Sequence, residues 1–454
     1  MARTVIKTTT TRPLYASEST YVSERTICGV DSTDVFEYYS ESPFALPGGY
    51  TPQDIAAAVR APTVAPRWRI WLLNPDDTVN ALIPPTDLIM GGNYSENYQS
   101  GQRRSLSFTL FDDDKTYAVG VNGIWFNTRI KLEMGLKMPD GGTAWITRGV
   151  YVVQNIEKSH SSNRDAISVS AADKWSLFDR ASGTLESTYE IPRDQEIIPI
   201  VESILAMDRE SGTSLDSLPP VIHPSFVGKR TQTSVTMNAG QTYAAILLEL
   251  ATQLSAEIYY NSTGHLTIMP YQETTRDDGK ASLWDFKEEA SEIDSLSFGF
   301  NSSEVFNRVI VIGSTANGQY HKAEASNEDP TSPTSVGRLG VRTAPIINDS
   351  NITTDYLAEE RAQYELRKIL ILKTSVSFNT PINPFPTANG VITISSPHYG
   401  MLRQRFVVQS VSCSLDYSGT MSVSASSIWN LPFLTRAESG EDAALLGEGG
   451  ERLW

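Results

Sequence analysis

The stretch Tyr151-Val-Val-Gln-Asn-Ile156, followed by a turn, Ser168-Val-Ser-Ala171 and Trp175, decides the fold because the chain carries it twice. Near the C-terminal end it reads Phe406-Val-Val-Gln-Ser-Val411, a turn, Ser422-Val-Ser-Ala425 and Trp429. A further matched pair precedes the copies, Ser105-Leu-Ser-Phe-Thr109 and Ser375-Val-Ser-Phe-Asn379. The blocks keep their order, and the spacing from Gln to the Ser-Val-Ser block differs by one residue in the turn, where insertions are tolerated. The sequence therefore predicts an internally duplicated module.

Each block alternates as a strand with one dry face does. β-Branched residues dominate, and the apolar Ile167, Val169 and Ala171 alternate with Ser168 and Ser170. The turn-rich connections 159–165 and 416–419 predict that each copy ends in a hairpin. The expected fold class is mainly β, with two modules that are antiparallel barrels or sandwiches and a small α+β domain between them.

Four residues of the duplicated blocks form the expected core: Phe108, Trp175, Phe378 and Trp429. The two tryptophans follow the hairpins at the same offset, and we expect each to plug the end of its module rather than to stack on a ligand.

Gln154 and Gln409 are polar at matched positions of a largely apolar face. Two interpretations stay open, because either these glutamines form hydrogen bonds inside the modules or their face meets a wet lumen.

Changes in periodicity along the chain predict five segments. Residues 1–66 form an N-terminal arm with a short helix near 51–59, and residues 67–180 form the first β-module. Residues 181–294 form the α+β middle domain, with helices near 197–205 and 242–254. Residues 295–433 form the second module, which also carries a helix at 355–372 and a long loop at 314–345. Residues 434–454 form an acidic, Gly-rich tail that we expect to be flexible.

Composition narrows the class of protein. The net charge of −16 argues against a sequence-specific nucleic-acid reader, although it allows DNA to pass nearby without sticking. No apolar run approaches the ~20 residues of a membrane-spanning helix, and the start of the chain has no apolar signal core, so we expect no membrane span and no Sec export. The two cysteines, Cys28 and Cys413, fit folding in a reducing cytoplasm.

No residue pattern predicts catalysis. The histidines are scattered without metal-ligand spacing, and no phosphate-binding, dinucleotide, nucleophile-elbow or metalloprotease motif appears. The run Asp112-Asp-Asp-Lys115 is interpreted as a solvated hairpin end, because nothing completes a calcium loop. We therefore expect no enzyme activity, no catalytic residue, no metal and no cofactor.

The order of the segments resembles the baseplate hub, or tail-tip hub, proteins of tailed bacteriophages. The resemblance rests on the first module, on Tyr243-Ala-Ala-Ile-Leu-Leu-Glu-Leu-Ala251 running into Ile258–Ile268, and on Asn307-Arg-Val-Ile-Val-Ile-Gly313, within about 67–432. It implies two barrels similar to the tail-tube subunit, and three chains in a ring that adapts the sixfold tube to the threefold tip and lines the DNA channel.

The resemblance also implies the partners and the location. The expected partners are two further copies of the chain, the tail tube or distal tail protein, tip, fibre or receptor-binding proteins, and the tape measure protein as a further candidate. The expected location is the virion tail, after synthesis in the cytoplasm of the host bacterium. The alternative function is a carbohydrate-binding or cell-wall-degrading tail protein that grips sugars with Trp68, Trp71, Trp125 and Trp145.

Overall fold

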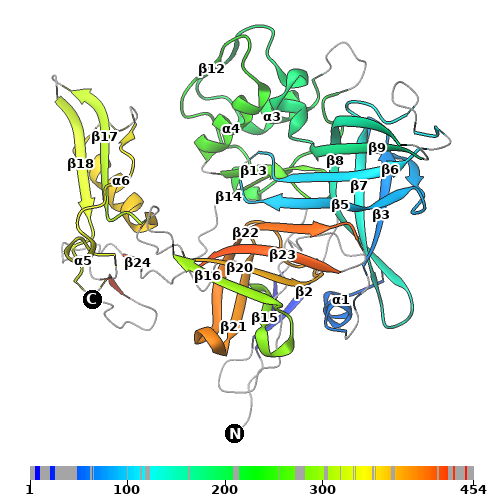
Figure 1. The fold of residues 1–454 in the computed structure, drawn as a ribbon. Coiled ribbons are helices and arrows are strands. Elements are labelled where there is room, and N and C mark those ends of the chain that lie inside the picture. The colour runs from blue at the N-terminus through cyan, green and yellow to red at the C-terminus, as the bar shows by residue number, and fades with distance from the viewer. Residues whose placement is uncertain are drawn as a thin grey trace.

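Most of the molecule consists of antiparallel strands in which apolar and polar residues alternate, as the computed structural model shows (Figure 1). The described residues are the four short strands Ile6–Thr10 (β1), Tyr21–Arg25 (β2), Phe433–Leu434 (β24) and Leu445–Leu446 (β25), and residues 49–427 apart from 62–63, 65, 100, 113–114, 118–122, 162–163, 208–213, 255, 271–281, 301–304, 317–318, 331, 333, 350–351, 353, 370–373 and 417–418.

The first module is an antiparallel sheet in the order β4-β3-β7-β8-β9-β6-β5. Its long strand β8 pairs with β7 through its first half and with β9 through its second half. The strands are Arg67–Leu73 (β3), Val79–Ile83 (β4), Leu88–Asn97 (β5), Arg104–Phe111 (β6), Arg129–Lys137 (β7), Thr143–Ser161 (β8) and Arg164–Asp173 (β9).

The second module repeats this order, as β15-β21-β22-β23-β20-β16 against β3-β7-β8-β9-β6-β5. The outermost pair differs, since β15 runs parallel to β21 whereas β3 runs antiparallel to β7. β15 lies inside the segment 181–294 expected as the middle domain, yet it pairs with the second module. The strands are Ser282–Lys287 (β15), Ser295–Phe300 (β16), Thr374–Pro381 (β20), Val391–Ser396 (β21), Met401–Ser414 (β22) and Thr420–Ser427 (β23).

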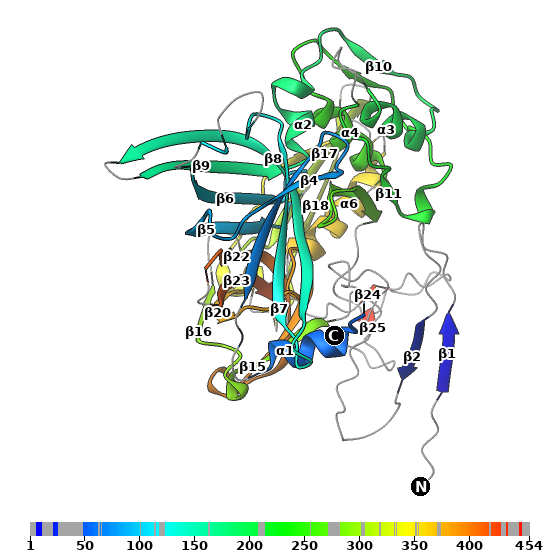
Figure 2. The same ribbon diagram turned by 90° about the vertical axis from the view of Figure 1, so that its right-hand side faces the viewer.

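One strand pair joins the two modules. β5 pairs antiparallel with the C-terminal half of β22, from Asn93 opposite Ser414 to Asn97 opposite Ser410, so both modules belong to one 13-stranded sheet. Figure 2 shows β9, β6, β5, β22, β23 and β20 one below the other.

The middle domain packs against the first module around its own apolar core. Its main helices bury the stripes that the sequence predicted, including Ile197 and Val201 of α3 and Ile246 and Leu250 of α4. Its elements are Ser176–Asp179 (α2), Tyr189–Ile191 (β10), Ile197–Leu205 (α3), Val221–Ile222 (β11), Val235–Met237 (β12), Tyr243–Leu254 (α4), Ala256–Tyr260 (β13) and Leu266–Pro270 (β14).

A fourth unit interrupts the second module and corrects the expected loop at 314–345. β18 (Gln319–Ser326) pairs along β17 (Arg308–Ala316), and α5 (Val336–Leu339), β19 (Ile347–Asn348) and α6 (Asp355–Ile369) complete the unit. β18 was missed because its only apolar contribution to the core is Ala323 and Ala325, between polar residues. Figure 1 shows this unit beside the large sheet.

The helix Pro52–Val59 (α1) lies near the end of the segment 1–66 that the sequence predicted to be an arm. Two hydrogen bonds cap its first turn. The Thr51 hydroxyl accepts the N–H of Asp54, and the Asp54 carboxylate accepts the N–H of Thr51 at 2.8 Å. Ile55 lies fully buried in the core that both modules share. In the predicted tail, β24 pairs with β25, and the rest of 434–454 lies outside the described residues.

Candidate functional site

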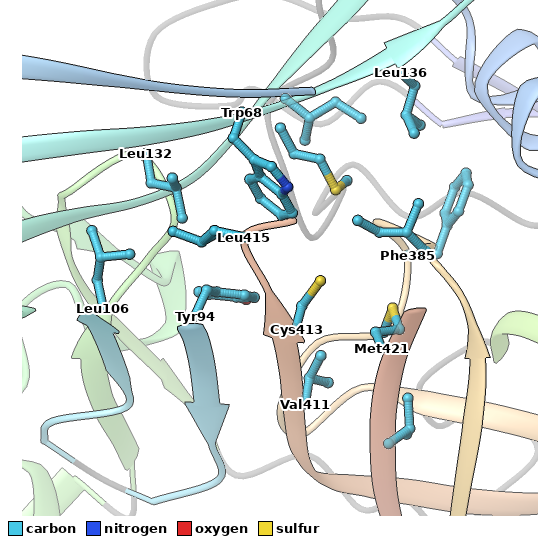
Figure 3. Close-up of a cluster of buried hydrophobic side chains, with 14 of the residues drawn as sticks. Trp68, Tyr94, Leu106, Leu132, Leu136, Phe385, Val411, Cys413, Leu415 and Met421 are labelled. Atoms are coloured by element: carbon cyan, nitrogen blue, oxygen red, sulfur yellow. The ribbon is translucent and has the colours of Figure 1, made fainter. Parts of the chain in front are cut away.

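The two faces of the joined sheet differ sharply in chemistry. Inward-facing side chains of both modules form a single apolar core across the β5–β22 junction (Figure 3). Tyr94 of β5 lies beside Cys413 of β22, and both are buried together with Leu415. The Trp68 indole N–H donates to the carbonyl of Asp416 at 3.1 Å, which ties β3 to the end of β22. The modules are therefore held by packing as well as by a strand pair.

The other face carries short hydroxyl and amide side chains, and we call it the hydroxyl face. The strand registers place all of these residues on one side of seven neighbouring strands, and each is exposed or half-buried. Apart from Gly299 they are Ser or Thr and Asn: Ser168 and Ser170 of β9, Ser105, Ser107 and Thr109 of β6, Asn93, Ser95 and Asn97 of β5, Ser410, Ser412 and Ser414 of β22, Ser422, Ser424 and Ser426 of β23, Ser375, Ser377 and Asn379 of β20, and Ser295 and Ser297 of β16.

These side chains bond to one another across the strands. Ser95 and Ser105 hydroxyls lie 2.6 Å apart, and the Ser422 hydroxyl donates to Asn379 at 2.6 Å. The positions of the hydroxyl face defined above are neutral and not aromatic, and the same side of the sheet ends at Phe111 of β6 and Arg164 of β9. Glu157 of β8, opposite Ser168 of β9, is the carboxylate at its margin. Such a surface stays wetted but has neither the cations that bind phosphates nor the rings that stack on bases.

A buried polar network fixes the junction of the modules. Arg148 of β8 donates to the hydroxyl of Tyr94 at 2.9 Å and to the carbonyl of Pro384, in the second module, at 2.8 Å. The Tyr94 hydroxyl donates to Glu96 at 2.8 Å, and Arg104 donates to Glu96 at 2.6 Å. Burial raises the pKa of Tyr94 well above its ordinary value, so the phenol remains a donor.

A second buried contact joins both modules to the middle domain. Glu257 of β13 accepts a bond from Arg103 at 3.0 Å and bonds at 2.6 and 2.7 Å from the side-chain amide of Asn389. The Arg103 guanidinium also lies 3.7 Å from the ring centre of Tyr259. One carboxylate of the middle domain thus bridges a residue of the first module and a residue of the second.

Asp173, at the end of β9, supports the same region. Its carboxylate accepts the backbone N–H groups of Arg103 at 2.7 Å, Arg104 at 2.9 Å and Trp175 at 3.2 Å. Burial raises the pKa of Asp173 to about 6, against the opposing effect of these donors.

The adjacent Lys174 is fully buried and locks the middle domain to the first module. Its ammonium lies 2.7 Å from Asp77 and 2.5 Å from Asp216, and it donates to the carbonyl of Gly264 at 3.0 Å. Arg129 also pairs with Asp77, at 2.8 Å. These groups neutralise one another, as buried charges must, and their role is structural.

The sequence predicted four core residues, of which the structure describes three. Phe108 lies opposite Val169 in the β6–β9 pair, and Phe378 lies opposite Val423 in the β20–β23 pair, both buried. Trp175 is buried in the core of the middle domain, near Phe178, instead of in the core shared by the modules. Trp429 lies outside the described residues.

Both glutamines form local hydrogen bonds, Gln154 with α2 of the middle domain and Gln409 with a serine of the hydroxyl face, so the two interpretations do not exclude each other. Gln154 donates to the carbonyl of Val152 at 3.2 Å and to the Ser176 hydroxyl at 2.9 Å. Gln409 donates to the Ser426 hydroxyl at 2.9 Å and points its amide at the carbonyl of Val407, 3.5 Å away.

The acidic run at 112–115 is a correction, because Asp112 is buried rather than solvated. Its carboxylate accepts the N–H of Tyr117 at 2.8 Å and pairs with Lys158 at 3.2 Å. Among the residues that the structure describes, no cluster of His, Cys, Asp and Glu could hold a metal ion, and no helix has the length and apolarity to cross a membrane.

The four tryptophans that the alternative function assigns to sugar binding lie in different environments. Trp68 is buried, and Trp71 and Trp145 flank Arg69, whose guanidinium lies 5.2 and 4.0 Å from their ring centres. Trp125 is exposed and contacts Phe126, with ring centres 4.8 Å apart. These four residues do not form one row of exposed rings.

Comparisons with known proteins identify the fold. No protein-family model matches the chain, and no curated protein matches its sequence. Among solved structures, the 43 kDa tail protein of prophage MuSo2 from Shewanella oneidensis aligns with a TM-score of 0.54 at 14% identity, over 80% of this chain and 98% of that one. A tail protein from Neisseria meningitidis aligns with a TM-score of 0.51 at 8% identity, over 80% and 98%.

A third similar structure, the half-lidded Francisella PdpA-VgrG complex, aligns with a TM-score of 0.51 at 11% identity, over 83% of this chain and 60% of that one. The mainly β fold class expected from the sequence, and from its resemblance to phage tail hubs, is confirmed. The chain therefore has the fold of these tail proteins.

Proposed function

We propose that this protein is a structural hub at the tip of a phage or phage-derived tail. Three copies form a ring of six modules around a channel, which adapts the sixfold tail tube to a threefold tip. The role is structural rather than enzymatic. The shared fold with prophage tail proteins supports the assignment to a tail, and the internal duplication supports the symmetry.

The observation that carries the proposal is the β5–β22 junction between two modules of the same strand order. A sixfold tube offers six similar surfaces. Three copies of a chain with two similar modules present six modules, one for each of these surfaces. The junction supplies the step from one module to the next inside each chain, with the sheet unbroken.

The hydroxyl face is the surface that we assign to the channel. It crosses the junction without a break, from β9 of the first module to β16 of the second. DNA binds proteins tightly through contacts of phosphates with Lys and Arg, and the positions of the hydroxyl face hold neither, while Arg164 stands at its outer margin on β9. Short neutral hydroxyls keep water at the wall and let a charged polymer slide past.

The proposed partners follow from the position in the tail. The ring stacks on the tail tube or distal tail protein at one side and carries tip, fibre or receptor-binding proteins at the other, with the tape measure protein as a candidate inside the channel. The protein is then part of the virion tail.

Electron cryomicroscopy of assembled tails tests the proposal. The expected map holds three copies of the chain at the tip, with the hydroxyl face toward the channel axis. Six copies, or a position outside the channel wall, would overturn the proposal. The variant Ser424→Arg with Ser377→Arg, which adds cations to the wall, should slow DNA ejection. The matched control, Ser203→Arg with Thr252→Arg, adds two cations at exposed positions of the middle domain and should leave ejection unchanged.

A further inference from the structure

Two strand edges, equivalent to the edges of β5 and β22 that pair at the junction, have no partner among the described strands. β16 pairs with β20 along one side, and its other side has no strand partner among the described residues. β8 beyond Val153 pairs only with β9 among the described strands. In Figure 2, β16 and the β8–β9 hairpin lie at opposite ends of the stacked strands. Exposed edges of this kind invite pairing with another chain.

The duplication identifies these two edges as equivalents of the joined ones. Tyr94 lies opposite Leu106, and Phe298 lies opposite Val376, at the matched positions of the duplicated block, so β16 corresponds to β5. The bulges at Gln154 and Gln409 align the second half of β8 with the second half of β22.

Matched apolar side chains are more buried at the paired edges than at the open edges. This difference is expected if another chain covers the open edges. At the junction, Tyr94, Val411 and Cys413 are buried. At the open edges, Phe298, which matches Tyr94, and Ile156, which matches Val411, lie only partly buried at the margin of the same core.

A backbone acceptor shows the same correspondence. At the junction, the carbonyl of Gly92 accepts the N–H of Leu415 at 2.8 Å. Its equivalent on β16, the carbonyl of Leu296, accepts the hydroxyl of Tyr399 at 3.3 Å, and Tyr399 is 44% exposed. On β16, the Tyr399 hydroxyl thus donates to the carbonyl that is equivalent to the one bonded by the Leu415 N–H at the junction.

We infer that the edge of β16 binds the second half of β8 from another copy of this chain, in the register of the β5–β22 junction. Ser297 then lies opposite Ser159, Phe298 opposite Lys158, and Gly299 opposite Glu157. The pairing is head to tail, covers Phe298 and Ile156, and extends the hydroxyl face from chain to chain. The inference rests on the proposed ring, and it adds the strands and the register that close it.

Cysteine pairs in assembled tails test the register. In a Cys28→Ser background, tails built from the Ser159→Cys, Ser297→Cys double variant are oxidised and run on a denaturing, non-reducing gel. We expect most of the chain to shift to covalent dimer and trimer. The matched control, Glu157→Cys with Ser297→Cys, is two residues out of register and should remain at the monomer mass, because a disulfide needs Cα atoms within about 7 Å. Mixing the two single variants should yield dimer only, which shows that the link joins different chains.

The outcomes separate this inference from the proposed function. A threefold ring without the cross-link, or with equal cross-linking in both variants, overturns the register but leaves the hub assignment. Tails whose tip holds no ring of this chain overturn both. If the variants prevent assembly, the wild-type map decides, since a neighbour other than β8 along β16 contradicts the inference.

Discussion

Gln154 and Gln409 occupy the same structural position in the two modules, each as the unpaired residue of a bulge. The registers shift between Val153 and Asn155 in the first module, and between Val408 and Ser410 in the second. Each amide reaches a serine hydroxyl at 2.9 Å. A bulge leaves backbone groups without ladder partners and bends its strand, so a side chain that bonds locally stabilises the bend. The duplication thus extends to a local irregularity as well as to the strand order.

Replacing either glutamine by alanine should destabilise the protein by a similar amount. We expect Gln154→Ala and Gln409→Ala each to lower the free energy of unfolding by about 1 kcal/mol, the usual net value of a hydrogen bond in a folded protein. Denaturant unfolding followed by tryptophan fluorescence measures the loss. The control Ser424→Ala, on the hydroxyl face, should change stability by less than about 0.5 kcal/mol. No loss in either glutamine variant would show that the bulges need no clamp.

Phe108 and Phe378 should contribute equally large amounts to stability. Both rings are buried at matched positions, so Phe108→Ala and Phe378→Ala should each cost about 3–5 kcal/mol, measured by the same unfolding experiment. Phe126→Ala is the matched control, because Phe126 is 52% exposed and little apolar area is lost. A loss below about 1 kcal/mol for either buried ring would contradict its place in the core.

Part of this architecture could be predicted from sequence because strand alternation is local. The hairpins, the matched phenylalanines and the helices α3, α4 and α6 follow from periodicities of 2 and 3.6. The β5–β22 junction could not be predicted, since pairing between strands so far apart leaves no local pattern. β18 was missed for a related reason, because two alanines give too weak an alternation.

The buried charges were the larger omission. Charged residues are rarely buried, so Arg103, Lys174 and Asp112 pass as surface residues in a sequence. One signal was available. The first copy continues Ala172-Asp-Lys-Trp175, whereas the second continues Ser426-Ser-Ile-Trp429. A charged pair present in one copy only indicates contacts that the other copy does not make, and here Lys174 contacts Asp216 and Gly264 of the middle domain.

Glu257 should be required for stability because it is buried with Arg103. Glu257→Ala leaves the guanidinium without its carboxylate and removes both acceptors of Asn389, so we expect a loss of about 3–5 kcal/mol in the free energy of unfolding. The exposed pair Arg230–Glu196 is the matched control, and Glu196→Ala should cost at most about 1 kcal/mol. Equal effects in the two variants would mean that the buried bridge adds nothing beyond a surface ion pair.

Asp173 should make stability fall as pH rises from about 4 to 6. Its pKa is raised to about 6 in the folded protein, from an ordinary value of 3.8, so the folded state binds this proton more tightly than the unfolded state does. Stability from this group is therefore greatest below pH 4, decreases up to pH 6 and is constant above that; the whole change corresponds to about 3 kcal/mol.

Asp173→Asn is uncharged at every pH and lacks this component, although it shifts stability by a constant amount through the altered N–H contacts. Urea unfolding of both proteins at pH 4, 5, 6 and 7 measures the difference, in which the other carboxylates cancel. Parallel curves over this range would show that the three backbone donors keep the Asp173 carboxylate ionised despite its burial.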